Sequence, residues 1–325
     1  MSDKQIKAVT VTLNPALDLT GAIDALNVGS VSLVNQGSLH AAGKGVNVAK
    51  VLSELGAKVT LTGFLGRNNE EAFCQLFEQM GATDRFIRVD GATRINVKLV
   101  ENSGQVSDIN FPGVPVNADA IRAFEATLLE LAETHDYFVI AGSLPQGVSP
   151  ELCASWVQRL RDLGKKVLFD SSRDALKAGI SAQPWLIKPN DEELSQLFNA
   201  ELTTRDQCQR AGQALSEKGI DNIVVSLGAE GVMWLNQGEW LHAQPPRMQV
   251  VSTVGAGDTL VAGLCWGHMQ QMPKPELIKF ATALSALAVS QVGVGVTSQQ
   301  ELDSVLQNIQ LQVLDAPTNQ LDTGK

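Results

Sequence analysis

The sequence predicts an α/β fold in which a mostly parallel central sheet is flanked by helices and carries a small second β-sheet. Short β-branched runs alternate with helical patterns, which is typical of parallel strands joined by crossover helices. Two stretches, at about 18–40 and 93–112, interrupt this alternation and have the pattern of paired strands. We therefore expect a single domain over 1–315 with these strands inserted as a lid, and a flexible tail over 316–325.

In the first half of the chain, predicted strands alternate with a predicted helix. The runs IKAVTVTL and AKVTLTGFLG are rich in valine and threonine, which favour strands. Between them, GKGVNVAKVLSELG has apolar residues at helical spacing, namely Val46, Ala49, Leu52 and Leu55. The stretch TRINVKLVENSGQVSDINF contains two alternating runs joined by a turn at 102–105, so it predicts a hairpin.

The second half continues in the same way. A helix is expected at about 118–133, followed by the strand YFVIAG. In SPELCASWVQRLRDLG, Ser149 can cap a helix, Pro150 suits its first turn and Gly164 ends it. The strands KVLFD, WLIKP and NIVVSLG follow, with helices between them.

Composition excludes several classes of protein. With 44% hydrophobic and 18% charged residues, the chain can bury a large core. Its net charge of -10 argues against an extended nucleic-acid surface. The N-terminus has no hydrophobic signal region and no stretch reaches membrane-spanning length, so we expect a cytoplasmic protein without a membrane partner. The four cysteines form no CxxC pair, which favours reduced thiols.

The sharpest local motif is STVGAGDTLVAGLCWG, in which a Gly-Ala-Gly turn leads into an apolar helix. Backbone amides at such a turn and the helix dipole favour an anion, and we expect a transferring phosphoryl group at Gly255, Ala256 and Gly257. Asp258 then lies where a carboxylate can accept a proton from an attacking hydroxyl. The alternative is a tight turn in which Asp258 is only a helix cap.

A second glycine-rich motif, AAGKGVNVAKVLSELG, also opens a helix. It differs from a P-loop because Ser38 and Gly45 occupy positions where that motif needs glycine and serine or threonine. Lys44 and Asn47 at the helix start can bind substrate hydroxyls or phosphate. A glycine-rich loop with a solvated lysine is the alternative interpretation.

Together the two motifs resemble the paired signatures of the PfkB (ribokinase-like) family of carbohydrate kinases. The first signature is AGKGVNVA followed by Gly56 and Gly66 at the family's spacing, and the second is STVGAGDTLVAGLC. The resemblance runs from TLNPALD to the helix containing 281–288. It is closest to the branch of bacterial 1-phosphofructokinases and tagatose-6-phosphate kinases, and HAAGKGVNVAKVL, TRINVKL and FDSSRDAL look most like the former.

On the sugar side, the resemblance implies a set of substrate-binding residues. Sugar hydroxyls would meet Asp18, Gly43, Lys44 and Asn47, and the substrate phosphate would meet Arg94 and Lys98. The alternation of Arg94, Asn96 and Lys98 along one strand places them on one face, where two cations suit a phosphorylated sugar. A solvated lid face is the alternative. Ser143 ends a strand, where it either touches substrate or belongs to a turn.

On the nucleotide side, the resemblance places ATP along SLGAEG, although an ordinary turn between strands is the alternative. These ATP-binding candidates are Ser226, Leu227, Gly228, Ala229, Glu230 and Gly231, together with Lys188, Asn190 and Gly257. Asn190 and Glu193 match the family's NxxE element, which implies Mg²⁺ held by Glu193 through water. Acidic residues in a first helical turn are also commonly dipole-stabilising without any metal.

The resemblance implies ATP-dependent phosphorylation of fructose 1-phosphate at its 6-hydroxyl, giving fructose 1,6-bisphosphate, with Asp258 as the base. A kinase for tagatose 6-phosphate or fructose 6-phosphate is the nearest alternative. A noncatalytic sensor of sugar phosphate or nucleotide is the alternative from another class. The expected cofactors are ATP and Mg²⁺, and the exposed lid strands suit a homodimer formed through the lid.

Overall fold

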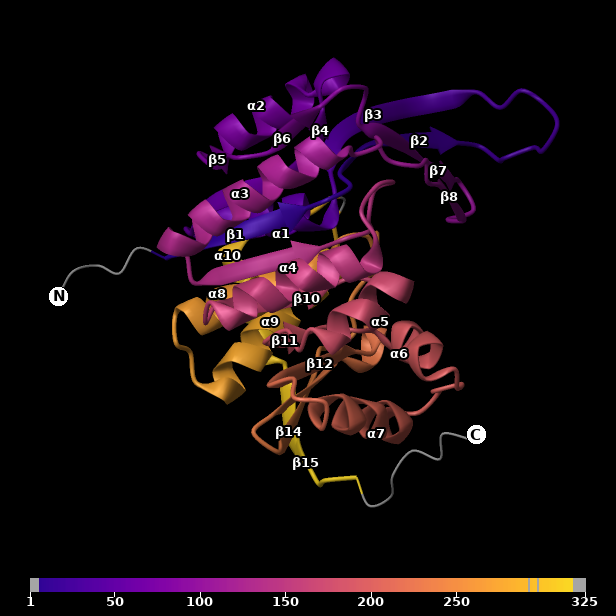
Figure 1. The fold of residues 1–325 in the computed structure, drawn as a ribbon. Coiled ribbons are helices and arrows are strands. Elements are labelled where there is room, and N and C mark those ends of the chain that lie inside the picture. Colours follow the sequence, from indigo (N-terminus) through magenta and orange to yellow (C-terminus); the bar gives the residue numbers. More distant parts are fainter. Residues whose placement is uncertain (1–5, 292, 297, 318–325) are drawn as a thin grey trace.

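The computed structural model describes residues 6–291, 293–296 and 298–317, so most of the predicted tail, 318–325, lies outside the described residues. Within the described part, the strands form one large sheet and one small sheet (Figure 1). Across the large sheet the order is β15 (Gln310–Leu314), β14 (Glu239–Gln244), β13 (Val232–Asn236), β12 (Asn222–Ser226), β11 (Leu186–Ile187), β10 (Lys166–Asp170), β9 (Tyr137–Ala141), β1 (Lys7–Thr12), β4 (Lys58–Gly66) and β5 (Thr83–Asp84), and β6 (Ile87–Val89) also pairs with β4.

The large sheet is parallel from β12 to β5, and this confirms the predicted mostly parallel sheet. Its other edge, β13 to β15, is antiparallel. The turn between β13 and β14 contains Gln237 and Gly238, both with positive φ, as a two-residue hairpin turn requires. This antiparallel edge was not predicted from the sequence.

Helices cover both faces of the large sheet (Figure 1). One face packs against α1 (Lys44–Glu54), α2 (Glu71–Gln79), α8 (Ala256–Met269), α9 (Lys274–Ala288) and α10 (Gln299–Gln307). The other packs against α3 (Ala118–Thr134), α4 (Pro150–Asp162), α5 (Arg173–Ser181), α6 (Asp191–Phe198) and α7 (Arg205–Ser216). Side chains of β1 alternate between the two layers, with Ala8 in the first and Val9 in the second, as a doubly covered strand requires. None of these helices has the length and apolarity that crossing a membrane requires.

The small sheet has the order β3, β2, β7, β8, and projects from one end of the molecule (Figure 1). Its strands are β2 (Ala16–Ile23), β3 (Val34–Ala42), β7 (Arg94–Glu101) and β8 (Val106–Ile109). β2 runs parallel to β7, and the two outer pairs are antiparallel. The predicted hairpin and the predicted second sheet are both present.

Two glycines shape the starts of α1 and α8. A Cβ on Gly45, in the first turn of α1, would lie 2.3 Å from Thr12 Oγ1 and 2.8 Å from the carbonyl oxygen of Val11. Gly255 precedes α8 with φ 82°, in the left-handed region that favours glycine. The first turn of α1 therefore reaches the carboxyl end of β1, at the edge where α/β proteins place their ligands.

Candidate active site

A cavity of about 920 Å³ lies between the carboxyl ends of the large sheet and the small sheet. It lies in the size range of small-molecule sites. The small sheet contributes Asp18, Arg94 and Asn96, and the first turns of α1 and α8 contribute further polar groups. Predicted residues in its lining are Asp18, Gly43, Lys44, Asn47, Arg94, Lys188, Asn190, Glu193, Ser226, Gly228, Ala229, Gly231, Gly255, Ala256, Gly257 and Asp258.

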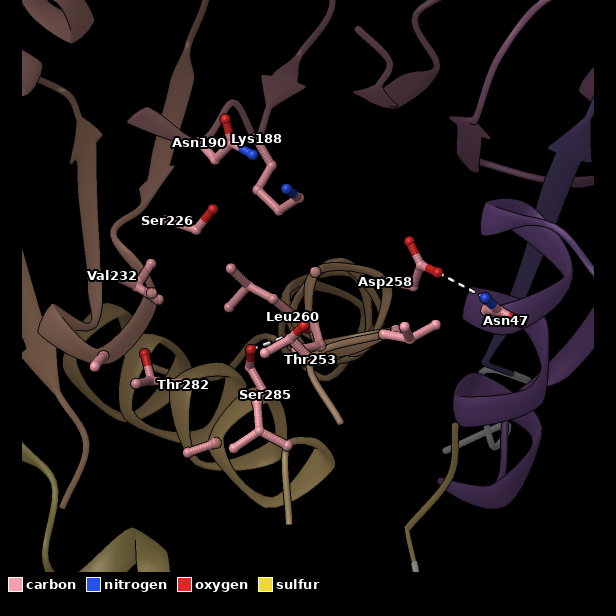
Figure 2. A pocket seen from close by; sticks show the side chains of 18 of the residues that line it. Asn47, Lys188, Asn190, Ser226, Val232, Thr253, Asp258, Leu260, Thr282 and Ser285 are labelled. Carbon is pink, nitrogen blue, oxygen red and sulfur yellow. Dashed lines mark hydrogen bonds between the residues drawn. The ribbon is translucent and has the colours of Figure 1, made fainter. Parts of the chain in front are cut away.

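Asp258 lies in the first turn of α8 with its carboxylate turned toward the cavity (Figure 2). The N-cap of α8 is Gly255, so the interpretation of Asp258 as the cap residue is wrong. Oδ2 of Asp258 instead accepts a 2.7 Å hydrogen bond from Nδ2 of Asn47 on α1. No other described residue donates a hydrogen bond to this carboxylate, so Oδ1 remains available to a ligand.

The environment of Asp258 shifts its ionisation toward neutral pH. Burial raises its pKa to about 6, and the negative charge of Asp170 adds to the increase. Lys44, the Asn47 hydrogen bond and Lys188 all act in the opposite direction. A carboxylate with such a pKa is mostly ionised at neutral pH and is more basic than an exposed aspartate, which suits proton acceptance.

A second buried carboxylate, Asp170, lies at the end of β10 between two lysines. Its Oδ2 lies 3.1 Å from Nζ of Lys44, and its Oδ1 lies 3.5 Å from Nζ of Lys188. Burial alone would raise the pKa of Asp170, but Lys188 and Lys44 outweigh burial and lower it. Asp170 also raises the pKa of Lys44. The carboxylate of Asp170 thus holds the two lysine ammonium groups beside Asp258.

Sequence reasoning did not select Asp170 as a site residue. The signal was present, because the predicted strand KVLFD ends on an aspartate and the ends of parallel strands share one edge of the sheet. The cavity also includes Thr253 and Leu260, which lie in the second glycine motif but were not selected, and Thr282 and Ser285, for which no motif gave a signal.

On the small-sheet side, Asp18 and Asn96 face each other across β2 and β7, with Asn96 Nδ2 3.2 Å from Asp18 Oδ1. Burial raises the pKa of Asp18 and lowers that of Arg94. The Arg94 guanidinium donates to the carbonyl oxygens of Asn14, Pro15 and Phe111 and lies 3.4 Å from Ser143 Oγ. The structure therefore brings Arg94 and Ser143 together, although Ser143 lies outside the cavity lining.

Lys98 lies on the same face of β7 as Arg94 and Asn96, but it is engaged elsewhere. Its Nζ lies 3.3 Å from Oδ1 of Asp108, directly opposite on β8. Lys98 is also outside the lining of the cavity. In this arrangement Arg94 is nearer the cavity than Lys98, and Lys98 would have to leave Asp108 to reach a ligand.

On the nucleotide side, the loop after β12 is formed by 227–231. Gly228, Ala229 and Gly231 line the cavity, whereas Leu227 and Glu230 do not. Asn190 and Glu193 form a capping box at the start of α6, with Asn190 N–H donating to Glu193 Oε2 at 3.0 Å. The Glu193 carboxylate is thus partly committed to the helix start.

The described residues contain no group of three or more histidine, cysteine, aspartate or glutamate side chains arranged to hold a metal ion. A direct protein cage for a divalent cation is therefore not part of this geometry. Glu193 in the cavity lining fits the weaker kind of site, in which Mg²⁺ keeps most of its water and is shared with phosphate groups.

The family model for pfkB family carbohydrate kinases matches residues 11–301, which includes both glycine motifs and the whole cavity. The chain belongs to the pfkB family of carbohydrate kinases. A 1-phosphofructokinase of Vibrio cholerae is 70% identical over 95% of this chain and 97% of its own length. A 1-phosphofructokinase of Escherichia coli is 47% identical over 94% of this chain and 98% of its own length.

Solved pfkB kinases have the same fold. Phosphofructokinase-2 from Escherichia coli in complex with potassium has a TM-score of 0.86 at 28% identity, over 93% of this chain and 99% of that one. The same protein in complex with substrates and products has a TM-score of 0.85 at 26% identity, again over 93% and 99%. The predicted ribokinase-like fold and the assignment as an ATP-dependent sugar kinase are confirmed.

Proposed function

We propose that this kinase transfers a phosphoryl group from ATP to the 6-hydroxyl of fructose 1-phosphate, giving fructose 1,6-bisphosphate. The single observation that carries the chemistry is Asp258, a buried carboxylate with a raised pKa at the start of α8, turned toward the cavity. The choice of fructose 1-phosphate rests on the relatives named 1-phosphofructokinase at 70% and 47% identity over nearly the whole chain.

Asp258 acts as the base in this proposal. Asn47 fixes one carboxylate oxygen through its hydrogen bond, so the other can accept the proton of the attacking hydroxyl. The product carboxylic acid is tolerated because burial already raises the pKa of Asp258 to about 6. The proton therefore moves to a group whose neutral form the protein stabilises.

The charge that develops on the phosphoryl oxygens is met by backbone and lysine groups. The amides of Gly255, Ala256 and Gly257 lie at the positive end of the α8 dipole. Lys44 and Lys188 stand on either side of Asp170, where their positive charges can balance the phosphates. A Cβ on Gly257 would lie 3.5 Å from Lys188 Nζ, so a glycine here leaves space beside the lysine.

Sugar binding is assigned to the small sheet and α1. The sugar hydroxyls are bound by Asp18, Gly43, Lys44 and Asn47. The substrate phosphate is bound by Arg94, and by Lys98 after its release from Asp108, and Ser143 beside Arg94 contacts the substrate. In ATP binding, Lys188 and Asn190 act with Ser226 and the loop 227–231. Gly228, Ala229 and Gly231 face the nucleotide, and Leu227 and Glu230 complete the loop from outside the cavity lining. Mg²⁺, when bound near Glu193 through water, would neutralise phosphate charge.

A substrate screen tests the proposal. ADP release is measured in a coupled assay with fructose 1-phosphate, fructose 6-phosphate and tagatose 6-phosphate at matched concentrations. We expect the highest kcat/KM with fructose 1-phosphate. A higher kcat/KM with either 6-phosphate would show that the protein is a kinase for a different substrate. Tight binding of ATP or sugar phosphate without any ADP release would show that the protein is a sensor.

We also propose that two copies associate through the outer face of the small sheet. Leu19, Leu39, Ile95 and Ile109 are each at least 39% exposed, and the strand register places them on one face, opposite Asp18 and Asn96. An apolar face of this kind on an open sheet fits a second copy of the same face. Light scattering after chromatography should give twice the chain mass, and Leu39→Glu should shift it toward one chain mass.

The remaining assignments follow from this activity. We propose that 1–315 works as one catalytic domain, with the small sheet as the lid that excludes water from the transfer. A cytoplasmic location fits the use of ATP and phosphorylated sugars. Neither assignment requires a nucleic-acid or membrane partner.

A further inference from the structure

We propose that His242 is a positioning residue that holds the loop 227–231 in the conformation that binds ATP. This inference rests on the proposed function, because it assigns a support to the same nucleotide site. His242 lies on β14, outside the cavity lining, and is 2% exposed. It therefore acts through the loop and not by touching the ligand.

Two hydrogen bonds fix the imidazole. Nε2 lies 2.7 Å from the carbonyl oxygen of Glu230, which can only accept, so Nε2 carries the proton. Nδ1 lies 3.4 Å from Nη1 of Arg205, which can only donate, so Nδ1 accepts. Both contacts require the same neutral tautomer, and burial, which lowers the pKa of His242, favours the neutral ring.

A second contact from β14 reaches the next residue of the loop. Gly231 has φ 93°, and a Cβ there would lie 2.1 Å from the carbonyl oxygen of Ala243. Gly231 also accepts a 2.8 Å hydrogen bond at its carbonyl from Leu227 N–H, which closes the loop. His242 and Ala243 of β14 therefore constrain two consecutive loop residues, Glu230 and Gly231.

The constraint has a direction. With the Glu230 carbonyl turned toward His242, the loop presents Gly228, Ala229 and Gly231 to the cavity. Without the imidazole N–H, the carbonyl of Glu230 would lose its side-chain donor and would gain by turning toward water. The N–H of the same peptide, on Gly231, donates to the carbonyl oxygen of Gly228 at 3.1 Å, so turning this peptide would also open the turn at Gly228. Rotation would change the loop surface that faces ATP and leave the sugar side unchanged.

The test compares His242→Leu with His242→Gln, whose side-chain amide can replace the Nε2 donor. ATP dissociation constants are measured by calorimetry without sugar phosphate, together with KM for fructose 1-phosphate and the melting temperature. We expect His242→Leu to weaken ATP binding about 5- to 20-fold, in line with the loss of one partly buried hydrogen bond. His242→Gln should recover most of this loss, and KM for fructose 1-phosphate should stay within about twofold of wild type.

His268→Leu is the matched control, since His268 is a partly buried histidine near the end of α8 whose Nε2 has no hydrogen-bond partner among the described residues. It should leave ATP affinity unchanged. The inference is overturned if His242→Leu binds ATP normally, if His242→Gln is no better than leucine, or if affinity for both substrates falls in equal proportion. Failure of the wild-type protein to bind ATP would reject the proposed function instead.

Discussion

Nδ2 of Asn47 donates a 2.7 Å hydrogen bond to Oδ2 of Asp258 and so joins the first turns of α1 and α8, from the two glycine-rich motifs of the chain (Figure 2). The residues are 211 positions apart in the sequence. Neither motif forms the site alone, because one supplies the carboxylate and the other orients it. The first two predictions concern the groups that set the pKa of this carboxylate.

Asn47→Ala should raise the pKa of Asp258 further, because the Asn47 hydrogen bond lowers it. The acidic limb of the kcat/KM profile should therefore move to higher pH. Loss of one hydrogen bond to a charged group, about 1.5–3 kcal/mol, should reduce kcat/KM at neutral pH by roughly 10- to 100-fold. A profile of kcat/KM from pH 5 to 9 checks this. If the acidic limb does not move, Asn47 does not influence the ionisation of Asp258.

Asp170→Asn should move the acidic limb of the kcat/KM profile to lower pH, because the negative charge of Asp170 raises the pKa of Asp258. The substitution also leaves Lys44 and Lys188 without their buried counter-charge, which should destabilise the fold by about 3 kcal/mol or more. Urea unfolding measures the stability and the pH profile measures the limb. A limb that moves to higher pH would contradict the electrostatic account.

Asp258→Asn should stabilise the unliganded protein at neutral pH. The folded-state pKa of Asp258, about 6, lies above the ordinary value of 3.8. Protonation of this carboxyl therefore stabilises the folded protein fully below about pH 4, and this contribution is lost as the pH rises through 6. Asparagine removes this penalty, and we expect a gain of about 1–3 kcal/mol at pH 7.5. The gain should shrink as the pH falls toward 4, and a variant less stable than wild type at pH 7.5 would contradict the raised pKa.

Gly45→Ala should reduce both stability and activity, although alanine is the better helix former. The new methyl group would lie 2.3 Å from Thr12 Oγ1 and would push α1 away from β1. We expect a loss of about 1–3 kcal/mol and a higher KM for sugar phosphate, since Lys44 and Asn47 move with the helix. Gly37→Ala on β3, with its nearest contact at 3.5 Å, is the control and should be nearly neutral.

Much of the fold could be predicted from the sequence because its parallel strands and helices have clear periodicities. IKAVTVTL and GKGVNVAKVLSELG became β1 and α1, and the hairpin in TRINVKLVENSGQVSDINF became β7 and β8. Strands β13 and β14 of the antiparallel edge were missed because VMWLN and EWLHAQ are each buried over four consecutive residues, so they lack the alternation of a half-exposed strand.

The candidate site was predicted where a motif marks it and missed where only the fold brings residues together. Asp258 and Lys44 stand in glycine motifs, whereas Asp170 lies in no motif and contacts Lys44, 126 positions away in the sequence. The role proposed for His242 likewise depends on contacts that no motif marks. The pairing of Lys98 with Asp108 likewise depends on strand register, which the sequence does not display.

The most direct test of the central claim is turnover by Asp258→Asn with fructose 1-phosphate and ATP, with ATP affinity measured on the same preparation. Loss of a general base should reduce kcat by about 10²- to 10⁴-fold, and ATP affinity should stay within about threefold of wild type. A kcat within about tenfold of wild type would show that Asp258 is not the base.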